Sequence, residues 1–176
     1  MAGWFKAGAA ALAMAALSVG GAAAQESTNR VAVETAWSGF VDGTPRECWA
    51  VSAPSETVNT RGGQAVSVRR GDILLFATYR QGGGDTAEVS FTGGYPFAEG
   101  STIEMVIGSD TFQLFTDGQW GWAGSPEDDA RILAALRRGQ NAVLTARSSR
   151  GTTTRDTFSL FGITAATDEA QRRCNE

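Results

Sequence analysis

Residues 147–163 have the sequence RSSRGTTTRDTFSLFGI, and this stretch decides how the chain closes its fold. Short segments that mix apolar and polar residues lie on both sides of a polar turn at Arg150-Gly151, a pattern typical of a β-hairpin. We therefore predict strands over 141–147 and 155–161. The second of these strands would complete the fold.

Further short segments at regular spacing predict the remaining strands. They cover residues 31–40, 47–52, 65–70, 72–79, 86–92, 102–107, 111–116 and 119–123. A helix should interrupt them, capped by Ser125, with Pro126 in its first turn and Gly139 at its end. Roughly nine to ten short strands with two short helices predict a mainly β fold, an antiparallel β-sandwich or a partly closed barrel.

The N-terminal segment has the pattern of a secretory signal peptide. Lys6 precedes an uncharged run that ends in Ala22-Ala23-Ala24, so we expect cleavage after Ala24. The alternative is an uncleaved anchor helix, although the Gly and Ala content makes the run weakly hydrophobic for a membrane span. Residues 25–176 would then form a single β-rich domain in the periplasm or outside the cell.

The chain contains two cysteines, Cys48 and Cys174, and an exported chain with two cysteines favours a disulfide between them. A closing helix over 164–173, capped by Thr164, would carry Cys174 back to the sheet. Two buried thiols and a bridge between two chains are the alternatives. A catalytic thiol is disfavoured because the chain has no histidine to pair with it.

The absence of histidine also removes the Ser-His-Asp arrangement and the common zinc sites. The sequence has no phosphate-binding GxxxxGK[ST] loop, and its acidic residues 127–129 are explained by the first turn of a helix without calcium. We therefore predict no catalytic residue, no metal and no cofactor. Nucleic acid is an unfavourable partner because the net charge is −4 and the arginines are scattered.

Trp120 and Trp122 flank Gly121 within one predicted strand, so both indoles should project from the same face of the sheet. Such a pair could form a face that binds a sugar or a protein, since indoles offer large contact areas. The alternative is that both rings belong to the core. We favour the core, because a domain of this size needs large inward side chains.

Asp156 shares its strand parity with Phe158 and Leu160 and should point inward with them. A buried carboxylate needs a charged or hydrogen-bonding partner, and we expect Arg147, across the hairpin, to form that ion pair. The functional alternative is a general acid or base with a raised pKa.

Several motifs follow one another along nearly the whole mature chain. They are Trp37, Cys48-Trp49-Ala50 with Ser52 and Pro54, Gly94-Tyr95-Pro96-Phe97, Trp122-Ala123, Arg150-Gly151-Thr152, Asp156-Thr157-Phe158-Ser159-Leu160 and Cys174. In this order they resemble the invasion-associated locus B family of bacterial envelope proteins. The resemblance implies an exported, non-enzymatic protein of the periplasm or outer surface, linked in some members to entry into host cells. It transfers no catalytic residue.

Two classes of function follow from these observations. The first is an interaction protein with an unknown envelope or host protein as its partner, for which an association with the outer membrane is one expectation. The second is a small-ligand or glycan-binding protein, or a hydrolase without histidine, which Trp120, Trp122 and Asp156 would serve. The exposure of the two indoles discriminates between a core and a binding role.

Overall fold

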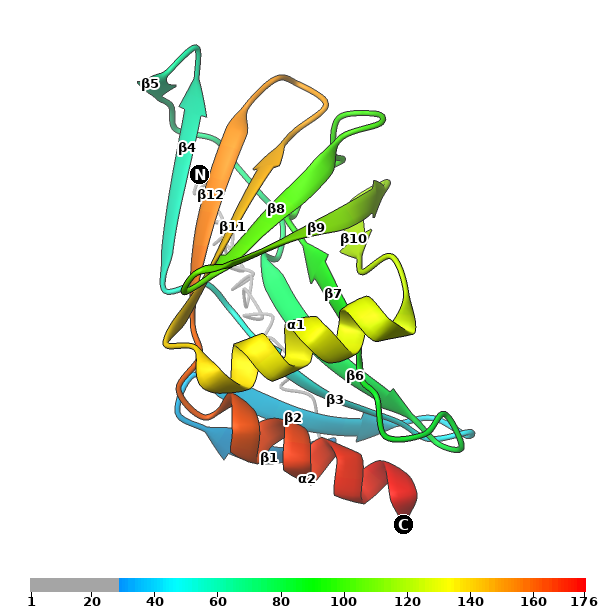
Figure 1. The fold of residues 1–176 in the computed structure, drawn as a ribbon. Helices are drawn as coiled ribbons and strands as arrows, with labels where there is room; N and C mark the ends of the chain where they lie inside the picture. The colour runs from blue at the N-terminus through cyan, green and yellow to red at the C-terminus, as the bar shows by residue number, and fades with distance from the viewer. Residues whose placement is uncertain (1–28) are drawn as a thin grey trace, which may run out of the picture.

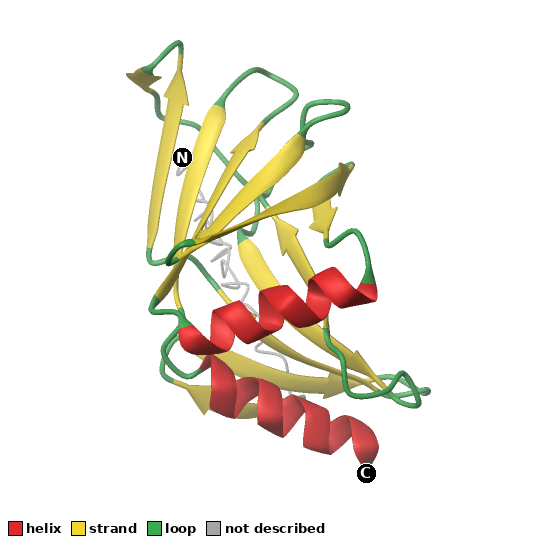
Figure 2. Ribbon diagram, in the orientation of Figure 1, coloured by secondary structure: helices red, strands yellow, loops and turns green. Residues whose placement is uncertain are grey.

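The computed structural model describes residues 29–176, which form one antiparallel sheet and two helices (Figures 1 and 2). The predicted signal peptide at 1–24 lies outside the described residues. Within 29–176, neither helix is long and apolar enough to cross a membrane.

The sheet contains twelve strands, more than the nine to ten expected. Their bounds are β1 Arg30–Glu34, β2 Trp37–Asp42, β3 Glu47–Ser52, β4 Glu56–Arg61, β5 Gln64–Ala65, β6 Leu74–Arg80, β7 Glu88–Thr92, β8 Thr102–Ile107, β9 Asp110–Asp117, β10 Trp120–Trp122, β11 Asn141–Arg147 and β12 Thr153–Ser159. The helices are α1 Pro126–Arg138 and α2 Ile163–Asn175. The order across the sheet is β1-β2-β3-β6-β7-β10-β9-β8-β11-β12-β4-β5.

The sheet curls so that strands far apart in this order face each other (Figure 1). Phe91 on β7 packs edge to face against Phe158 on β12, with ring centroids 6.0 Å apart, although four strands separate them in the sheet. The Trp37 indole on β2 donates a hydrogen bond to the Ser159 carbonyl at 3.0 Å. The edge strands β1 and β5 do not pair with each other, so the sheet stays open. The predicted mainly β, antiparallel and partly closed architecture is confirmed.

The concave face of the curl holds the hydrophobic core. Pleat alternation places every second residue of β3, β6, β7, β8 and β12 inward. Fully buried members include Ala50, Leu75, Val89, Phe91, Ile103, Met105, Leu144 and Phe158. α1 crosses the open side of the curl and contributes Ile132 and Leu136, while α2 lies beside β1, β2, β3 and β6 (Figure 1).

The predicted disulfide is confirmed. Cys48 on β3 and Cys174 at the end of α2 are bonded, with Cα atoms 5.6 Å apart. Ala166 and Ala170 lie on the same buried face of α2 and are fully buried. Their small side chains let the helix approach the sheet closely enough for the bond.

Helix α1 begins and ends as predicted, with Ser125 accepting a hydrogen bond from the Asp128 amide and Gly139 ending the helix. The prediction that Thr164 caps α2 is wrong. α2 begins at Ile163 after Gly162, which adopts a left-handed φ of 94°. A Cβ at Gly162 would lie 2.0 Å from the Glu34 carbonyl oxygen, so only glycine lets the chain turn this close to β1.

Two strand predictions are also wrong. The single strand predicted over 31–40 is the hairpin of β1 and β2, which turns at Thr35 with a φ of 54°. Residues 65–70 lie mostly outside strands, and β4 was missed. The sequence of β4, ETVNTR, is polar and largely exposed because β4 lies near the edge of the sheet, so it lacks the alternation that signals a strand.

Candidate functional site

Trp120 and Trp122 lie on the convex face of the sheet, and the expectation that they belong to the core is wrong. Trp120 is 38% exposed and Trp122 is half-buried, whereas Gly121 between them points inward and is buried. A Cβ at Gly121 would lie 2.3 Å from Cδ1 of Ile103, so the interior is already filled at this point. The prediction that both indoles share one face is correct.

The two indoles are part of a larger aromatic surface. We call it the aromatic face and define it as Phe40, Trp49, Phe76, Phe115, Trp120 and Trp122. Strand registers align Phe76, Trp122 and Phe115 in one row across β6, β7, β10 and β9. Phe115, at the end of that row, is 60% exposed.

Ring contacts join five of these six side chains in two groups. Phe40 and Trp49 stack with centroids 5.7 Å apart and planes 12° apart. Trp120 contacts Phe76 at 5.7 Å and stacks on Trp122 at 6.3 Å with planes 24° apart. The rings within each group hold one another in place, so less side-chain entropy is lost when a partner binds.

A charged rim borders the aromatic face at one end. Arg80 donates hydrogen bonds to Glu47 at 2.9 Å and to Glu88 at 3.1 and 3.2 Å. These three residues, together with Trp49 and the Trp120-Trp122 pair, line a shallow hollow of about 320 Å³. Since one guanidinium pairs with two carboxylates, the rim keeps one net negative charge beside the ring surface of the hollow.

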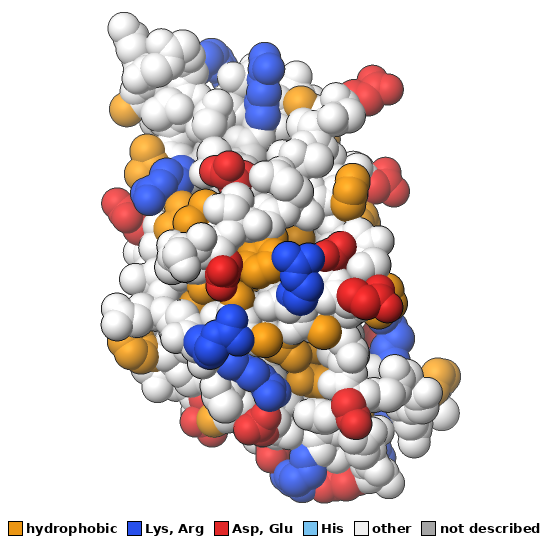
Figure 3. Space-filling view, in the orientation of Figure 1, with side chains coloured by type: hydrophobic (Ala, Val, Ile, Leu, Met, Phe, Trp, Pro, Cys, Tyr) orange, Lys and Arg blue, Asp and Glu red, His pale blue; other side chains and the backbone are white. Residues whose placement is uncertain are grey.

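Both helices leave the aromatic face uncovered, because their apolar residues pack on the concave side. Leu133 of α1 and Ala170 of α2 contact Ala77 and Ala87, whose side chains point inward. On the side of the molecule that carries the helices, acidic and basic side chains are interspersed with hydrophobic ones (Figure 3). The ordered aromatic rows lie instead on the bare convex strands.

Asp156 is buried as predicted, but its partner is Arg70 and not Arg147. The Arg70 guanidinium makes a bidentate pair with the carboxylate at 2.7 and 2.6 Å, and the two side chains are 6% and 0% exposed. Arg147 is exposed and pairs in register with Thr153, so it points to the opposite face from Asp156. Arg70 was missed because it lies 86 residues from Asp156, and the strand predicted over 65–70 did not place it opposite that carboxylate.

Arg70 connects three segments around this carboxylate. Its Nε donates to the Gly93 carbonyl at 2.8 Å, and its Nη1 donates to the Asn59 side chain at 3.3 Å. The guanidinium also lies 5.0 Å from the ring centre of Tyr95, whose hydroxyl hydrogen-bonds Thr154. Burial raises the pKa of the Tyr95 hydroxyl, so it stays protonated at neutral pH.

This geometry makes Asp156 a structural clamp. Both carboxylate oxygens are engaged by one guanidinium, which leaves neither free to exchange a proton with a substrate. Within residues 29–176, no group of three or more His, Cys, Asp or Glu side chains is placed to hold a metal ion.

One signal in the sequence could have placed part of the aromatic face. Cys48 must point toward Cys174 under α2, so its neighbour Trp49 has to project from the opposite face. Phe40, Phe76 and Phe115 carry no such signal. Their convergence depends on which strands pair and in what register.

Comparison with known proteins gives two findings. The model of the family described as Invasion associated locus B (IalB) protein matches residues 37–171. Among solved structures, the chain is similar to the crystal structure of invasion associated protein B from Bartonella henselae, with a TM-score of 0.55 and 13% identity, over 81% of this chain and 96% of that chain. At this identity the likeness concerns the fold alone. No curated protein matches the chain.

Proposed function

Because the chain belongs to the invasion associated locus B family, we propose that it is an exported envelope protein that acts by binding another protein through its aromatic face. The predicted signal peptide and the Cys48–Cys174 disulfide favour the periplasm or the outside of the cell. The family name refers to invasion, which favours a partner in the bacterial envelope or on a host cell.

The observation that carries this proposal is the uncovered row of aromatic side chains on the convex sheet. Tryptophan and other aromatic residues are enriched among the few residues that dominate binding energy at protein interfaces. Exposed apolar patches rimmed by polar residues mark interaction sites on folded proteins.

The extent of the aromatic face favours a protein over a single sugar. From β2 to β9 the face crosses five strand-to-strand steps, or about 24 Å at the usual strand spacing. A standard protein interface covers about 800 Å² on each partner, a patch of similar width. The hollow beside Trp120 and Trp122 occupies only one part of this surface.

A non-enzymatic role is part of the same proposal. The chain has no histidine for general base catalysis near neutral pH. Its buried carboxylate, Asp156, is held by Arg70 on both oxygens. Glu47 and Glu88, the carboxylates beside the aromatic face, both pair with Arg80.

Affinity capture from bacterial envelope and host-membrane extracts tests the proposal. The purified protein is compared with a Trp120→Ala/Trp122→Ala double variant and with Phe161→Ala, a matched control that removes an aromatic ring 62% exposed in the turn between β12 and α2. We expect one captured protein that the double variant loses and the control retains.

Two outcomes contradict the proposal. Capture that the double variant retains would show that the aromatic face is not the binding surface. Glycan-array binding that Trp122→Ala abolishes, without any captured protein, would replace the protein partner with a carbohydrate.

A further inference from the structure

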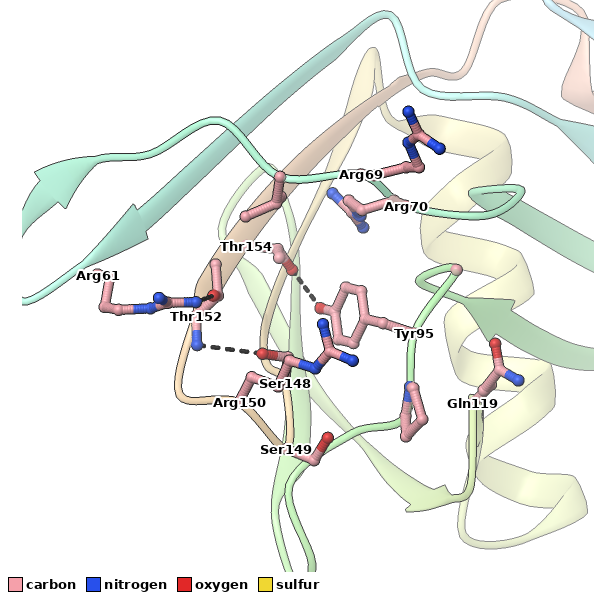
Figure 4. A pocket seen from close by; sticks show the side chains of 13 residues that line it. Arg61, Arg69, Arg70, Tyr95, Gln119, Ser148, Ser149, Arg150, Thr152 and Thr154 are labelled. Carbon is pink, nitrogen blue, oxygen red and sulfur yellow. Dashed lines mark hydrogen bonds between the residues drawn. The ribbon is translucent and has the colours of Figure 1, made fainter.

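A second cavity lies on the concave side of the sheet, away from the aromatic face. It has a volume of about 460 Å³ and is lined by Arg61 of β4, by Gln119 before β10 and by three segments that meet at one end of the curl (Figure 4). These are residues 68–70 before β6, residues 94–96 after β7, and residues 148–154 in the β11–β12 turn and the start of β12. Gly71 donates a backbone hydrogen bond to Gly94 at 2.9 Å and holds the first two segments together.

Four arginines, Arg61, Arg69, Arg70 and Arg150, line this cavity, which we call the arginine pocket (Figure 4). No acidic side chain lines it, and the nearest carboxylate, Asp156, neutralises only Arg70. The pocket therefore has a surplus of three positive charges in a chain whose net charge is −4. A local field opposite to that of the whole chain attracts anions to one place.

The arginines differ in how they are held. Arg61 donates a 2.8 Å hydrogen bond to the Thr152 hydroxyl, which fixes its guanidinium at the wall. Arg69 and Arg150 are exposed and have no ion-pair partner among residues 29–176. Arg150 is directed toward Tyr95, whereas Arg69 is directed away from the other lining side chains, so the Arg150 guanidinium is the one placed to bind a ligand (Figure 4). A guanidinium presents two parallel N–H groups that match the oxygens of a phosphate.

The Arg70 guanidinium does not use all of its hydrogen-bond donors. A guanidinium has five N–H groups, and Arg70 uses one on Gly93, one on Asn59 and two on Asp156. One N–H of Nη2 remains without an acceptor in the described part of the chain. Because Arg70 is fixed by four hydrogen bonds and lines the pocket, this donor is preorganised for an oxyanion.

The rest of the lining suits a sugar. Hydroxyl groups of Ser148, Ser149, Thr152 and Thr154 and the amide of Gln119 surround the arginines, and the ring of Tyr95 forms one wall. The volume corresponds to about fifteen water molecules, far more than a bare phosphate needs. We propose that the arginine pocket binds a phosphorylated sugar, either free or as the head group of a lipid.

Calorimetric titration with glucose 6-phosphate tests the inference, with glucose and inorganic phosphate titrated separately. Arg150→Ala should weaken glucose 6-phosphate binding about tenfold, since it removes a charged hydrogen-bonding group. Arg155→Ala is the matched control, because Arg155 is an exposed arginine on β12 that faces away from the pocket. The control should bind like the wild-type protein.

A second arm identifies the source of the sugar phosphate. Phosphatidylcholine vesicles with and without lipid A, whose disaccharide carries phosphate groups, are sedimented with the protein. Binding to the lipid A vesicles alone, weakened by Arg150→Ala, assigns the pocket to a lipid head group. Binding of glucose 6-phosphate without vesicle binding assigns it to a soluble ligand.

Three results overturn the inference. The first is the absence of binding both to millimolar glucose 6-phosphate and to lipid A vesicles. The second is binding that Arg150→Ala leaves unchanged. The third is inorganic phosphate binding as tightly as glucose 6-phosphate, which would remove the sugar from the proposal. None of these bears on the aromatic face, because the Trp120→Ala/Trp122→Ala variant alters the opposite side of the sheet.

Discussion

The sharpest test of the fold is the substitution Asp156→Ala. The change removes the carboxylate and leaves the Arg70 guanidinium, only 6% exposed, without its ion-pair partner. Arg70 keeps its bonds to Gly93 and Asn59 but loses both charged hydrogen bonds. A buried positive charge is then left uncompensated beside Tyr95.

The expected loss in the free energy of unfolding is about 3–5 kcal/mol, the usual result of removing one partner from a buried ion pair. This is a large share of the roughly 5–15 kcal/mol that stabilises a typical domain. Removing both partners with Arg70→Met/Asp156→Leu should cost less than Asp156→Ala alone, because no charge stays buried and unpaired.

Urea denaturation followed by tryptophan fluorescence measures these differences. Arg147→Ala is the control, since Arg147 is exposed and does not touch Asp156, and it should change stability by less than about 0.5 kcal/mol. If Asp156→Ala and Arg147→Ala have the same small effect, the clamp between β12 and the segment before β6 does not contribute to folding. An Asp156→Ala variant too unstable to purify is replaced by Asp156→Asn, which should fall between the two.

Three further predictions concern other parts of the molecule. Cys48→Ala opens a loop of 126 residues and should cost roughly 4–5 kcal/mol, with hydrogen exchange in α2 rising before exchange in the sheet. Burial raises the pKa of Asp129 in the folded protein above its unfolded value. The protonated side chain therefore stabilises the fold below about pH 4, and this stabilisation is lost as the pH rises through the folded pKa. Asp129→Asn keeps an acceptor for the Val89 amide and should unfold at higher urea than the wild type at neutral pH, with the difference vanishing in acid. Gly121→Ala places a Cβ 2.3 Å from Cδ1 of Ile103 and should lower the free energy of unfolding by about 1–3 kcal/mol in the same urea assay. An unchanged urea midpoint would mean that the core at β10 is loosely packed.

The sequence predicted correctly those helices and strands whose boundaries are marked by residues within a few positions of one another. α1 has a capping serine, an early proline and a terminal glycine, and it forms where these residues indicate. The hairpin of β11 and β12 and the inward side of Asp156 follow from alternation within single strands. Such signals depend on neighbouring residues, which the sequence displays directly.

The pairing between distant segments could not be predicted in the same way. Arg70 reaches Asp156 only because the curl brings the segment before β6 against β12, and no spacing in the sequence encodes that approach. Trp120 and Trp122 were assigned to the core because a domain of this size needs large inward side chains, but Ile103 from β8 already fills the interior beside Gly121. The deciding contact in each case joins residues from different strands.

The two proposed surfaces are chemically independent, because they lie on opposite faces of the sheet and on different strands. Pleat alternation sends Asp156 of β12 inward and Arg155 outward, and it separates Gly121 of β10 from the indoles on either side in the same way. A substitution on one face therefore changes no contact on the other, and the effects of distant, unconnected sites add. A variant that combines Trp122→Ala with Arg150→Ala should lose protein capture as much as Trp122→Ala alone and sugar phosphate binding as much as Arg150→Ala alone. If either single variant lost both kinds of binding, the two residues would act through one site or through the stability of the sheet.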